Sequence, residues 1–447
     1  MNIIIAGDGE VGFHLAKTLT EMDMNITVVD PHTELLSRLE KNFDILTITG
    51  SSTSPDVLHE ANVDKCDLFL SVLHDESINL ITCMVANRLG AKRTVARISN
   101  AEYLSPKNRE MFRSLGVDEM VCPERIAAKE ITNLLNNDLA TEYFDFSGGL
   151  LTMYLVRLEQ ESLVVGKSVR ELLVGYKTLH VRIVAILRNS ETIIPHSDFV
   201  FQPGDLAYII SKPNQIEAIR QLVGKNEVNV RNVMIAGGGR IGRYAAKALE
   251  ERMSVKIIDN NRNRCTELSS VMGKKTLVLE GDVTDIDFLM DEGVQDCDAF
   301  IALTESSETN VLTCLHARRL GVKRTIALVE NTGFINISQD IGIDTIINKK
   351  LITASYIARF IVSGQAVSTK WLSGTNAELI EFVVGKHSPA TRKPIGALQI
   401  PIGATIGGII RGRETIIPTR ETQLQEMDKV VVFTMPRLME EVAKRFK

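Results

Sequence analysis

The amino-acid sequence contains one pattern twice, once in each half of the chain. Its opening stretch, residues 1–30, matches residues 233–259, and SINLITCMVANRLGAKRTVARISN further on matches ETNVLTCLHARRLGVKRTIALVEN. In this second pair Asn79 corresponds to Asn310, and the later segments SETIIP and RETIIP also match. A repeat that extends this far predicts a duplicated fold, in which each half holds a domain of about 130 residues and a smaller one of about 80.

Each copy opens with a glycine motif between two apolar strands. In the first copy Gly7, Gly9 and Gly12 form GxGxxG directly after the apolar run Ile3–Ile5, and Asp30 ends the next strand. In such a unit the first glycine turns the chain, the second lets a pyrophosphate approach the backbone, and the third lets the helix pack on the strand. An acidic residue about 20 residues further on accepts hydrogen bonds from a ribose diol. The pattern therefore predicts a doubly wound parallel sheet with a nucleotide crevice.

The second copy repeats this motif with Gly237, Gly239, Gly242 and Asp259. An aspartate at the end of the strand repels a 2′-phosphate, so NAD(H) is favoured over NADP. ATP or ADP fits the same pattern, because its ribose carries the same diol. A domain of this type that has lost its ligand is the alternative interpretation.

The two glycine loops differ in charge. The first, GDGEVG, carries Asp8 and Glu10, whereas the second, GGGRIG, carries Arg240 and is followed by Arg243. The amino end of a helix attracts phosphate through its free N–H groups and its dipole, which carboxylates oppose and guanidinium groups reinforce. We therefore hypothesise that the second crevice binds anionic nucleotides more tightly, unless Arg97 compensates in the first.

Further residues of the first copy lie near the carboxyl ends of expected strands, where ligands bind in parallel sheets. Leu73 and His74 follow the stretch DLFLSV, and Arg97 lies near the end of RTVARI. Arg97 could reach a phosphate, or it could pair with a carboxylate such as Asp75 or Glu102. The sequence leaves both possibilities open.

The second copy differs at these positions. Leu328 stands where the first copy has Arg97, and the counterpart of His74 is Thr304 or Glu305, depending on where a one-residue shift is placed. A single histidine beside a cleft is more often a hydrogen-bonding side chain than a catalyst, and we interpret His74 in this way.

Composition narrows the class of protein. The chain is 44% hydrophobic and 24% charged, as in a globular protein, and its net charge of −5 argues against a general nucleic-acid binder. No apolar run approaches the roughly 18 residues of a membrane span, and no basic region precedes the first strand as in a secretory signal. Six cysteines without a CxxC pair argue against disulfides and a zinc site. We expect them to pack in cores, in a reduced, cytosolic compartment.

Two helices carry further expectations. We expect Thr33 to be the N-cap of the helix that follows Asp30. The helix that starts at Pro123 has an apolar stripe and leaves the first nucleotide-type domain. It could exchange between protomers or simply link to the next domain, and the sequence does not decide between them.

The order of GDGEVG, VVD, the strand ending in TG, SINLITCMVANRLGAKRTVARI and the trailing IIP…GD segment resembles the RCK (KTN) family. These domains regulate potassium channels and transporters. The resemblance covers essentially the whole chain and implies two Rossmann-like doubly wound parallel sheets (RCK-N), each followed by a small α+β domain (RCK-C). The four domains are expected at residues 1–140, 141–227, 230–355 and 366–447.

The resemblance also implies a function. It implies a homo-oligomeric ring, dimer or tetramer, that is cytoplasmic and peripheral on the inner face of the plasma membrane. The ring docks on an integral-membrane potassium-translocating subunit and gates it on binding NAD(H) or, alternatively, ATP/ADP.

The nucleotide-binding residues follow from motif position, and no catalytic or metal-binding residue is expected. The first site comprises Gly7, Asp8, Gly9, Glu10, Val11, Gly12, Asp30, Leu73, His74 and Arg97. The second comprises Gly237, Gly238, Gly239, Arg240, Ile241, Gly242 and Asp259. The acidic first loop and Leu328 depart from the family pattern, so we do not assume that the two sites are equally occupied.

An NAD-dependent dehydrogenase is the alternative function. It would need a substrate domain with an acid–base group, commonly His or Lys with a carboxylate partner. The small domains hold few candidates, His180 and His196 in one and His387 in the other, with no matched partner. Because duplication of both domains suits a symmetric ring better than one active site, we expect a regulatory protein and not an enzyme.

Overall fold

A computed structural model describes residues 1–7, 9–20, 24–136, 142–175, 181–189, 191–212, 215–224, 229–331, 333–361, 366–371 and 377–446. The chain divides into two compact units. One comprises residues 1–127 with 349–361, and the other comprises residues 128–348 with 362–447. Each unit is described by itself below.

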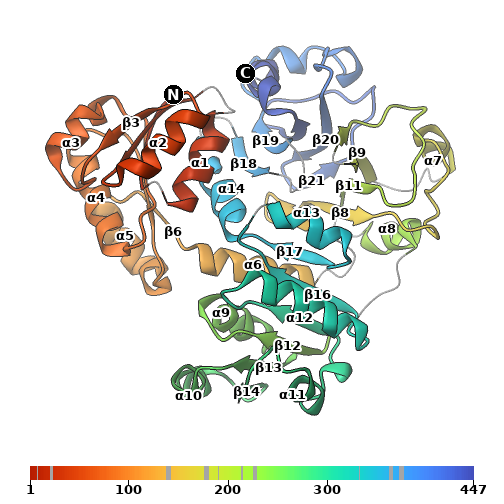
Figure 1. Ribbon diagram of the computed structural model, residues 1–447. Coiled ribbons are helices and arrows are strands. Elements are labelled where there is room, and N and C mark those ends of the chain that lie inside the picture. Colours follow the sequence, from red (N-terminus) through yellow and green to blue (C-terminus); the bar gives the residue numbers. More distant parts are fainter. Residues whose placement is uncertain are drawn as a thin grey trace. The chain divides into compact units, whose positions relative to one another are not determined.

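The first copy of the repeat forms a six-stranded parallel sheet in the order β3-β2-β1-β4-β5-β6 (Figure 1). Its strands are β1 (Asn2–Ala6), β2 (Asn25–Asp30), β3 (Leu46–Thr49), β4 (Leu68–Ser71), β5 (Thr94–Arg97) and β6 (Glu119–Val121). Its helices are α1 (Glu10–Thr20), α2 (Thr33–Asn42), α3 (Pro55–Glu60), α4 (Glu76–Arg88) and α5 (Pro106–Ser114). The strand order reverses between β1 and β4, and ligands of doubly wound sheets bind beyond the strand ends at such a point.

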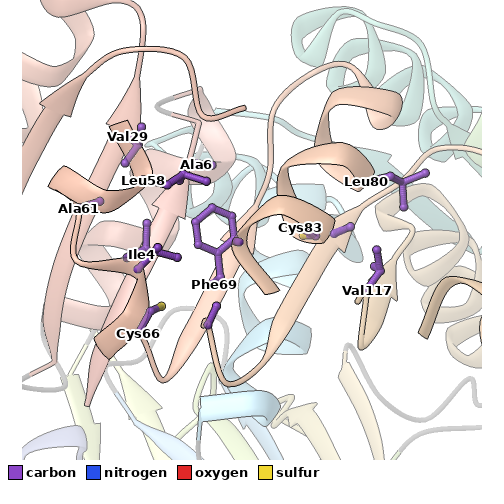
Figure 2. Close-up of a cluster of buried hydrophobic side chains, with 14 of the residues drawn as sticks. Ile4, Ala6, Val29, Leu58, Ala61, Cys66, Phe69, Leu80, Cys83 and Val117 are labelled. Atoms are coloured by element: carbon purple, nitrogen blue, oxygen red, sulfur yellow. The ribbon is translucent and has the colours of Figure 1, made fainter. Parts of the chain in front are cut away.

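Residues of β1 and β4 are buried on both faces of this sheet, which explains their continuous apolar sequence. On one face a cluster that includes Ile4, Leu58, Cys66 and Cys83 packs around Phe69. Figure 2 shows the Phe69 ring in the middle of these side chains. The cluster joins the sheet to α3 and α4, and so holds the carboxyl ends of β1 and β4 in place.

The second copy forms a second six-stranded parallel sheet in the equivalent order β14-β13-β12-β15-β16-β17. Its strands are β12 (Asn232–Ala236), β13 (Ser254–Asp259), β14 (Thr276–Glu280), β15 (Ala299–Ala302), β16 (Arg324–Leu328) and β17 (Thr345–Ile347). Its helices are α9 (Arg240–Leu249), α10 (Arg262–Val271), α11 (Ile286–Asp291), α12 (Ser307–Arg319) and α13 (Gly333–Asp340). The expected duplication of the doubly wound sheet is confirmed.

Each parallel sheet is followed in the chain by a five-stranded antiparallel sheet, and the two orders, β10-β9-β11-β8-β7 and β18-β19-β22-β20-β21, are equivalent. The first contains β7 (Glu142–Phe146), β8 (Leu151–Arg157), β9 (Val181–Arg188), β10 (Glu191–Ile193) and β11 (Leu206–Ser211). The second contains β18 (Ala366–Trp371), β19 (Glu378–Val383), β20 (Ala404–Arg411), β21 (Glu414–Ile416) and β22 (Lys429–Thr434). The helices of these domains are α7 (Val169–Gly175), α8 (Ile216–Val223) and α15 (Met439–Phe446).

An ion pair between a partly exposed arginine and a buried aspartate recurs in both small domains. Arg188 donates two hydrogen bonds of 2.7 Å to Asp205, and Arg411 donates to Asp428 at 2.9 and 2.8 Å. Both aspartates are 1% exposed, and each also accepts a hydrogen bond from the main-chain N–H three residues before it. The GD and MD turns of the repeated sequence therefore hold one fork-shaped contact in both copies.

The two antiparallel sheets pack on each other and share a core (Figure 1). A Cβ atom on Gly408 would lie 2.5 Å from a methyl group of Leu151, so the absence of a side chain permits this close approach. Arg182 donates to the main-chain oxygen of Pro418 at 3.0 Å, and Thr415 donates to that of Leu150 at 2.9 Å. The small domains thus form one body from equivalent halves.

The two long helices that follow the parallel sheets pack on the opposite copy. α14 (Lys349–Ile361) follows β17 in the chain but packs on α1 and β6 of the first copy. Burial lowers the pKa of His14 on α1, and the nearby Lys17 and Lys350 lower it further. α6 (Pro123–Asn136) follows β6, and its Leu134 main-chain oxygen accepts a 3.4 Å hydrogen bond from buried Arg324 of β16. The sequence left open whether the helix that starts at Pro123 is exchanged between protomers or only links to the next domain. In the structure this helix and α14 are exchanged between the two copies of the repeat within one chain.

One expected helix start is wrong by a residue. α2 begins at Thr33, and His32 occupies the N-cap position without a side-chain capping bond. The main-chain N–H and ring Nδ1 of His32 instead contact Oδ1 of Asp30 at 2.9 and 2.7 Å. This turn after β2 places His32, not Thr33, at the cap.

The six cysteines are free and buried, as expected from the sequence. Burial raises the pKa of Cys66, Cys122 and Cys297 to about 11 and also raises that of the other three. Because the thiolate is the nucleophile, a pKa of about 11 leaves only about one in a thousand of the Cys66 thiols ionised at pH 8. We expect iodoacetamide at pH 8 to leave the native chain unlabelled and to label all six cysteines in denaturant, as measured by mass spectrometry. Rapid native labelling would contradict their burial.

Candidate functional site

The glycine loops adopt the backbone that their sequence predicts. Gly7 and Gly237 both have φ of +111°, a conformation that favours glycine. A Cβ atom on Gly12 would lie 1.9 Å from the Gly7 oxygen, and one on Gly242 would lie 2.1 Å from the Gly237 oxygen. The third glycine of each motif is therefore required for the contact of helix with turn.

The second glycine of each motif has a different role. A Cβ atom on Gly9 or Gly239 would meet no atom within 4 Å. The fold of these loops therefore does not require glycine there, whereas close approach of a pyrophosphate to the backbone does. This open space at the start of α1 and α9 fits a nucleotide whose phosphates lie against the loop.

Asp30 ends β2 and is 3% exposed. Its Oδ1 accepts hydrogen bonds from the main chain and ring of His32. A carboxylate at this position, beyond the glycine loop, is suited to a ribose diol.

Asp259 ends β13 and is 4% exposed, but its contacts differ. Its Oδ2 accepts hydrogen bonds from the Gly238 N–H at 2.8 Å and from Arg264 Nη1 at 3.0 Å. Its Oδ1 accepts the Asn261 N–H at 2.9 Å. The Gly238 N–H thus joins the second acid to its own loop, and the acid also contacts an arginine of α10. In the first copy Leu35 occupies the position of this arginine.

A buried asparagine fixes the ends of the strands opposite the first loop. Oδ1 of Asn79 accepts the Leu73 N–H at 2.8 Å and the Ser71 hydroxyl at 2.9 Å. Its Nδ2 donates to the main-chain oxygens of Leu73 and Arg97, both at 2.9 Å. Asn79 therefore joins the carboxyl ends of β4 and β5, beside the crevice.

Asn310 makes the same three main-chain bonds in the second copy, and its Oδ1 accepts the Thr304 hydroxyl at 2.7 Å in place of a strand serine. It accepts the N–H of Thr304 at 2.9 Å and donates to the main-chain oxygens of Thr304 and Leu328 at 3.0 and 2.9 Å. Thr304 therefore corresponds to Leu73, and Glu305 to His74, which resolves the one-residue ambiguity. His74 and Glu305 are both exposed, and this position holds no matched acid–base group.

Arg97 lies at the end of β5 with a half-buried side chain. Among the described residues it forms no ion pair with Asp75 or Glu102. Asp75 instead caps α4 by accepting the N–H groups of Ile78 and Ser77, which lower the pKa of its carboxyl. The guanidinium of Arg97 therefore stays a candidate phosphate ligand.

The charge difference between the loops is described only in part. Asp8 lies outside the described residues, and Glu10 is described only as the first residue of α1. In the second loop Arg240 is exposed, whereas Arg243 forms a 2.7 Å ion pair with Glu267. Arg243 is thus partly neutralised, and tighter binding in the second crevice stays a prediction.

Behind the loops, Val11 and Ile241 are buried.

Sequence reasoning missed the roles of three residues in this region. Asn79 and Asn310 were recognisable as a repeated pair, but their hydrogen bonds to main-chain atoms leave no mark in the sequence. Arg264 stands five positions after Asp259, whereas the first copy has Leu35 at the corresponding position. This difference between the copies was the one sign in the sequence that Arg264 has a special role. In the parts of the chain that the structure describes, no cluster of metal-ligating residues occurs and no helix is long and apolar enough to cross a bilayer.

Two families of known domains match this chain, and each of them matches it twice. Residues 3–123 and 233–349 match the TrkA-N domain family, and residues 153–224 and 379–447 match the TrkA-C domain family. The chain is 32% identical to the Trk system potassium uptake protein TrkA homolog of Archaeoglobus fulgidus, with 100% of both chains covered. It is 31% identical to TrkA of Halomonas elongata, covering 98% of this chain and 96% of that protein.

A solved structure described as the GsuK channel bound to NAD has a similar fold. It superposes with a TM-score of 0.61 at 19% identity, covering 100% of this chain and 78% of the GsuK chain. At this identity the likeness concerns the fold alone.

Proposed function

Because the chain belongs to the TrkA family of Trk system potassium uptake proteins, we propose that it is a nucleotide-sensing regulatory subunit of a potassium uptake system. The observation that carries the proposal is the repeated crevice. In each copy a glycine loop with open space above its second glycine faces a buried aspartate at the next strand end. NAD(H) suits this arrangement, and ATP or ADP is the alternative ligand.

The TrkA family is a family of potassium uptake regulators and not of catalytic enzymes, and the dehydrogenase alternative has little support in the site. Among the described residues His196 packs beside Phe199, and His387 lies 3.8 Å from exposed Glu426. His180 lies outside the described residues. A hydride-transfer enzyme would need an acid–base group at the crevice, and the exposed His74 has no partner there among them.

We propose that the nucleotide acts through helix packing. α1 begins directly at the first glycine loop, and α14 packs on α1. A nucleotide can shift the balance between two arrangements only by its difference in affinity for them. Couplings of this kind are usually about 1–3 kcal/mol, enough for a five- to 150-fold change in a gating equilibrium.

The proposed partner is an integral-membrane potassium-translocating subunit of the TrkH/TrkG type, with the chain peripheral on the cytoplasmic face of the plasma membrane. A homo-oligomeric ring, dimer or tetramer, needs contact surfaces. Matched exposed apolar side chains that suit this role lie on the equivalent helices α4 and α12, on the equivalent helices α5 and α13, and directly after the latter two. These are Ile81 with Leu312, Met111 with Ile337, and Leu115 with Ile341.

Affinity purification from detergent-solubilised membranes tests the proposal. With saturating NADH, and separately with ATP, we expect an integral-membrane potassium transporter subunit to copurify with the chain. The purified chain is expected to bind NADH without oxidising it in the presence of small carbonyl compounds. Recovery of no such membrane protein, or sustained NADH turnover, would argue against a regulatory role.

A further inference from the structure

The two crevices differ at the end where the ribose would bind. Asp30 and Asp259 occupy the same place at the ends of β2 and β13, but the helices that follow them carry opposite charges. In α2 the first turn contains Glu34, and Leu35 comes next. In α10 the corresponding turn contains Arg262, and Arg264 takes the place of Leu35.

Arg264 is positioned beside the carboxylate that faces the ribose. Its Nη1 lies 3.0 Å from Oδ2 of Asp259, which also accepts the Gly238 N–H of the glycine loop. An arginine has five N–H donors, and the contact described for Arg264 uses one of them. Its side chain is 41% exposed, so the remaining donors are accessible from solvent.

The surrounding charges also differ between the copies. Arg262 lies 3.9 Å from Glu280, and both side chains are largely exposed. Counting Asp259, Arg262, Arg264 and Glu280, the ribose end of the second crevice is neutral. In the first copy Thr49 stands at the position of Glu280, so that Asp30 and Glu34, counted with the neighbouring His32 neutral, leave a net negative charge.

We propose that Arg264 adapts the second crevice to adenosine nucleotides that carry a 2′-phosphate, of the NADPH type, whereas the first crevice accepts only a 2′-hydroxyl. The inference rests on the proposed function, since it assumes that both crevices bind adenosine nucleotides. In doubly wound nucleotide domains an arginine close to the strand-end acid accommodates the 2′-phosphate. Here the same guanidinium offsets the charge of Asp259, which by itself would repel that phosphate, and offers further donors in the fork geometry that phosphate prefers.

The competing explanation is that Arg264 only holds Asp259 in place for a ribose diol. The two explanations differ in which ligand depends on Arg264. A residue that positions Asp259 affects NADH and NADPH alike, whereas a residue that reads the 2′-phosphate affects NADPH alone.

The test is isothermal titration of NADPH and NADH into full-length chains in which one crevice is silenced. Gly9→Asp silences the first crevice and Gly239→Asp the second, since neither position is sterically crowded. In the Gly9→Asp chain, Arg264→Leu copies the first crevice. In the Gly239→Asp chain, Leu35→Arg copies the second, at a position that is 37% exposed. Thermal unfolding of each variant shows that it is folded.

With Arg264 present we expect NADPH to bind the second crevice within about tenfold of NADH. Arg264→Leu should weaken NADPH by about tenfold to a hundredfold, the range for a hydrogen bond to a charged group, and change NADH by less than about threefold. Leu35→Arg should strengthen NADPH binding in the first crevice by about tenfold.

Equal weakening of both ligands by Arg264→Leu, or NADPH binding that is already more than about a hundredfold weaker than NADH, would overturn the assignment of Arg264 while nucleotide sensing stands. Failure of NADH, NADPH and ATP alike to bind either crevice of the unmodified chain would instead refute the proposed function.

Discussion

Replacing Asn79 with alanine is expected to lower the free energy of unfolding of the first nucleotide domain by about 3–5 kcal/mol. Asn79 is 1% exposed, and all four of its hydrogen bonds end on atoms of β4, β5 or the segment between β4 and α4. Alanine would leave the part-buried Leu73 N–H and two part-buried main-chain oxygens without this partner. Each unsatisfied buried group costs about 1–3 kcal/mol. Asn310→Ala should have the same effect on the second domain.

Hydrogen exchange with peptide resolution is the appropriate measurement, because a chain with several domains does not unfold as one two-state unit. Amide protection in β4 and β5 should fall in Asn79→Ala and stay unchanged in β15 and β16. Asn87→Ala on the same helix is the matched control, because no hydrogen bond of its side chain is found among the described residues. Protection in Asn79→Ala as high as in this control would contradict a structural role for the asparagine.

Replacing Gly9 with aspartate is expected to weaken nucleotide binding in the first crevice by at least about a hundredfold without unfolding the domain. A Cβ atom at Gly9 meets nothing within 4 Å, so the loop can accept a side chain. The added carboxylate would occupy the space above the loop and repel the phosphates across a distance of roughly 4 Å, where like charges near a protein surface interact strongly. Gly7 is a poorer choice, because its φ of +111° and a Cβ position 3.1 Å from the Leu73 nitrogen predict a folding defect.

Calorimetry should report the loss of one of two binding events in Gly9→Asp and of the other in Gly239→Asp. Gly175→Asp is the matched control, since its Cβ position is equally open but lies at the end of α7, far along the chain from either loop. Two intact binding events in both loop variants would mean that nucleotides bind elsewhere or not at all.

The features that the sequence predicted correctly are those with a local or periodic cause. The GxGxxG turns require glycine for reasons that act within a few residues, and apolar runs such as Ile3–Ile5 identify strands buried on both faces. Because the sequence repeats, each strand or turn predicted in one half was also expected at the matching residues of the other half. The helix at Pro106–Ser114 was not anticipated, because its sequence, PKNREMFRS, is mostly polar and buries only Phe112.

The features that escaped prediction depend on contacts between distant residues. Nothing in the sequence of residues 349–361 shows that this helix packs on α1 and β6, since its apolar stripe would suit either sheet. The bonds of Asn79 run to main-chain atoms, which every residue carries. The contact of Arg264 with Asp259 depends on the course of the turn after β13, which the sequence does not reveal. Asp259 itself was predicted because it lies about 20 residues after the glycines, as the motif requires.

The reciprocal placement of α6 and α14 has a consequence for the origin of the chain. A protein consisting of only one half would expose the surface on which the other half's helix lies, and its own helix would have nothing to cover. Two such halves satisfy each other through an isologous exchange, so the present polypeptide corresponds to an ancestral pair of identical subunits joined end to end. Once joined, the two halves were free to diverge, and corresponding positions beside the two acids now hold leucine in one half and arginine in the other.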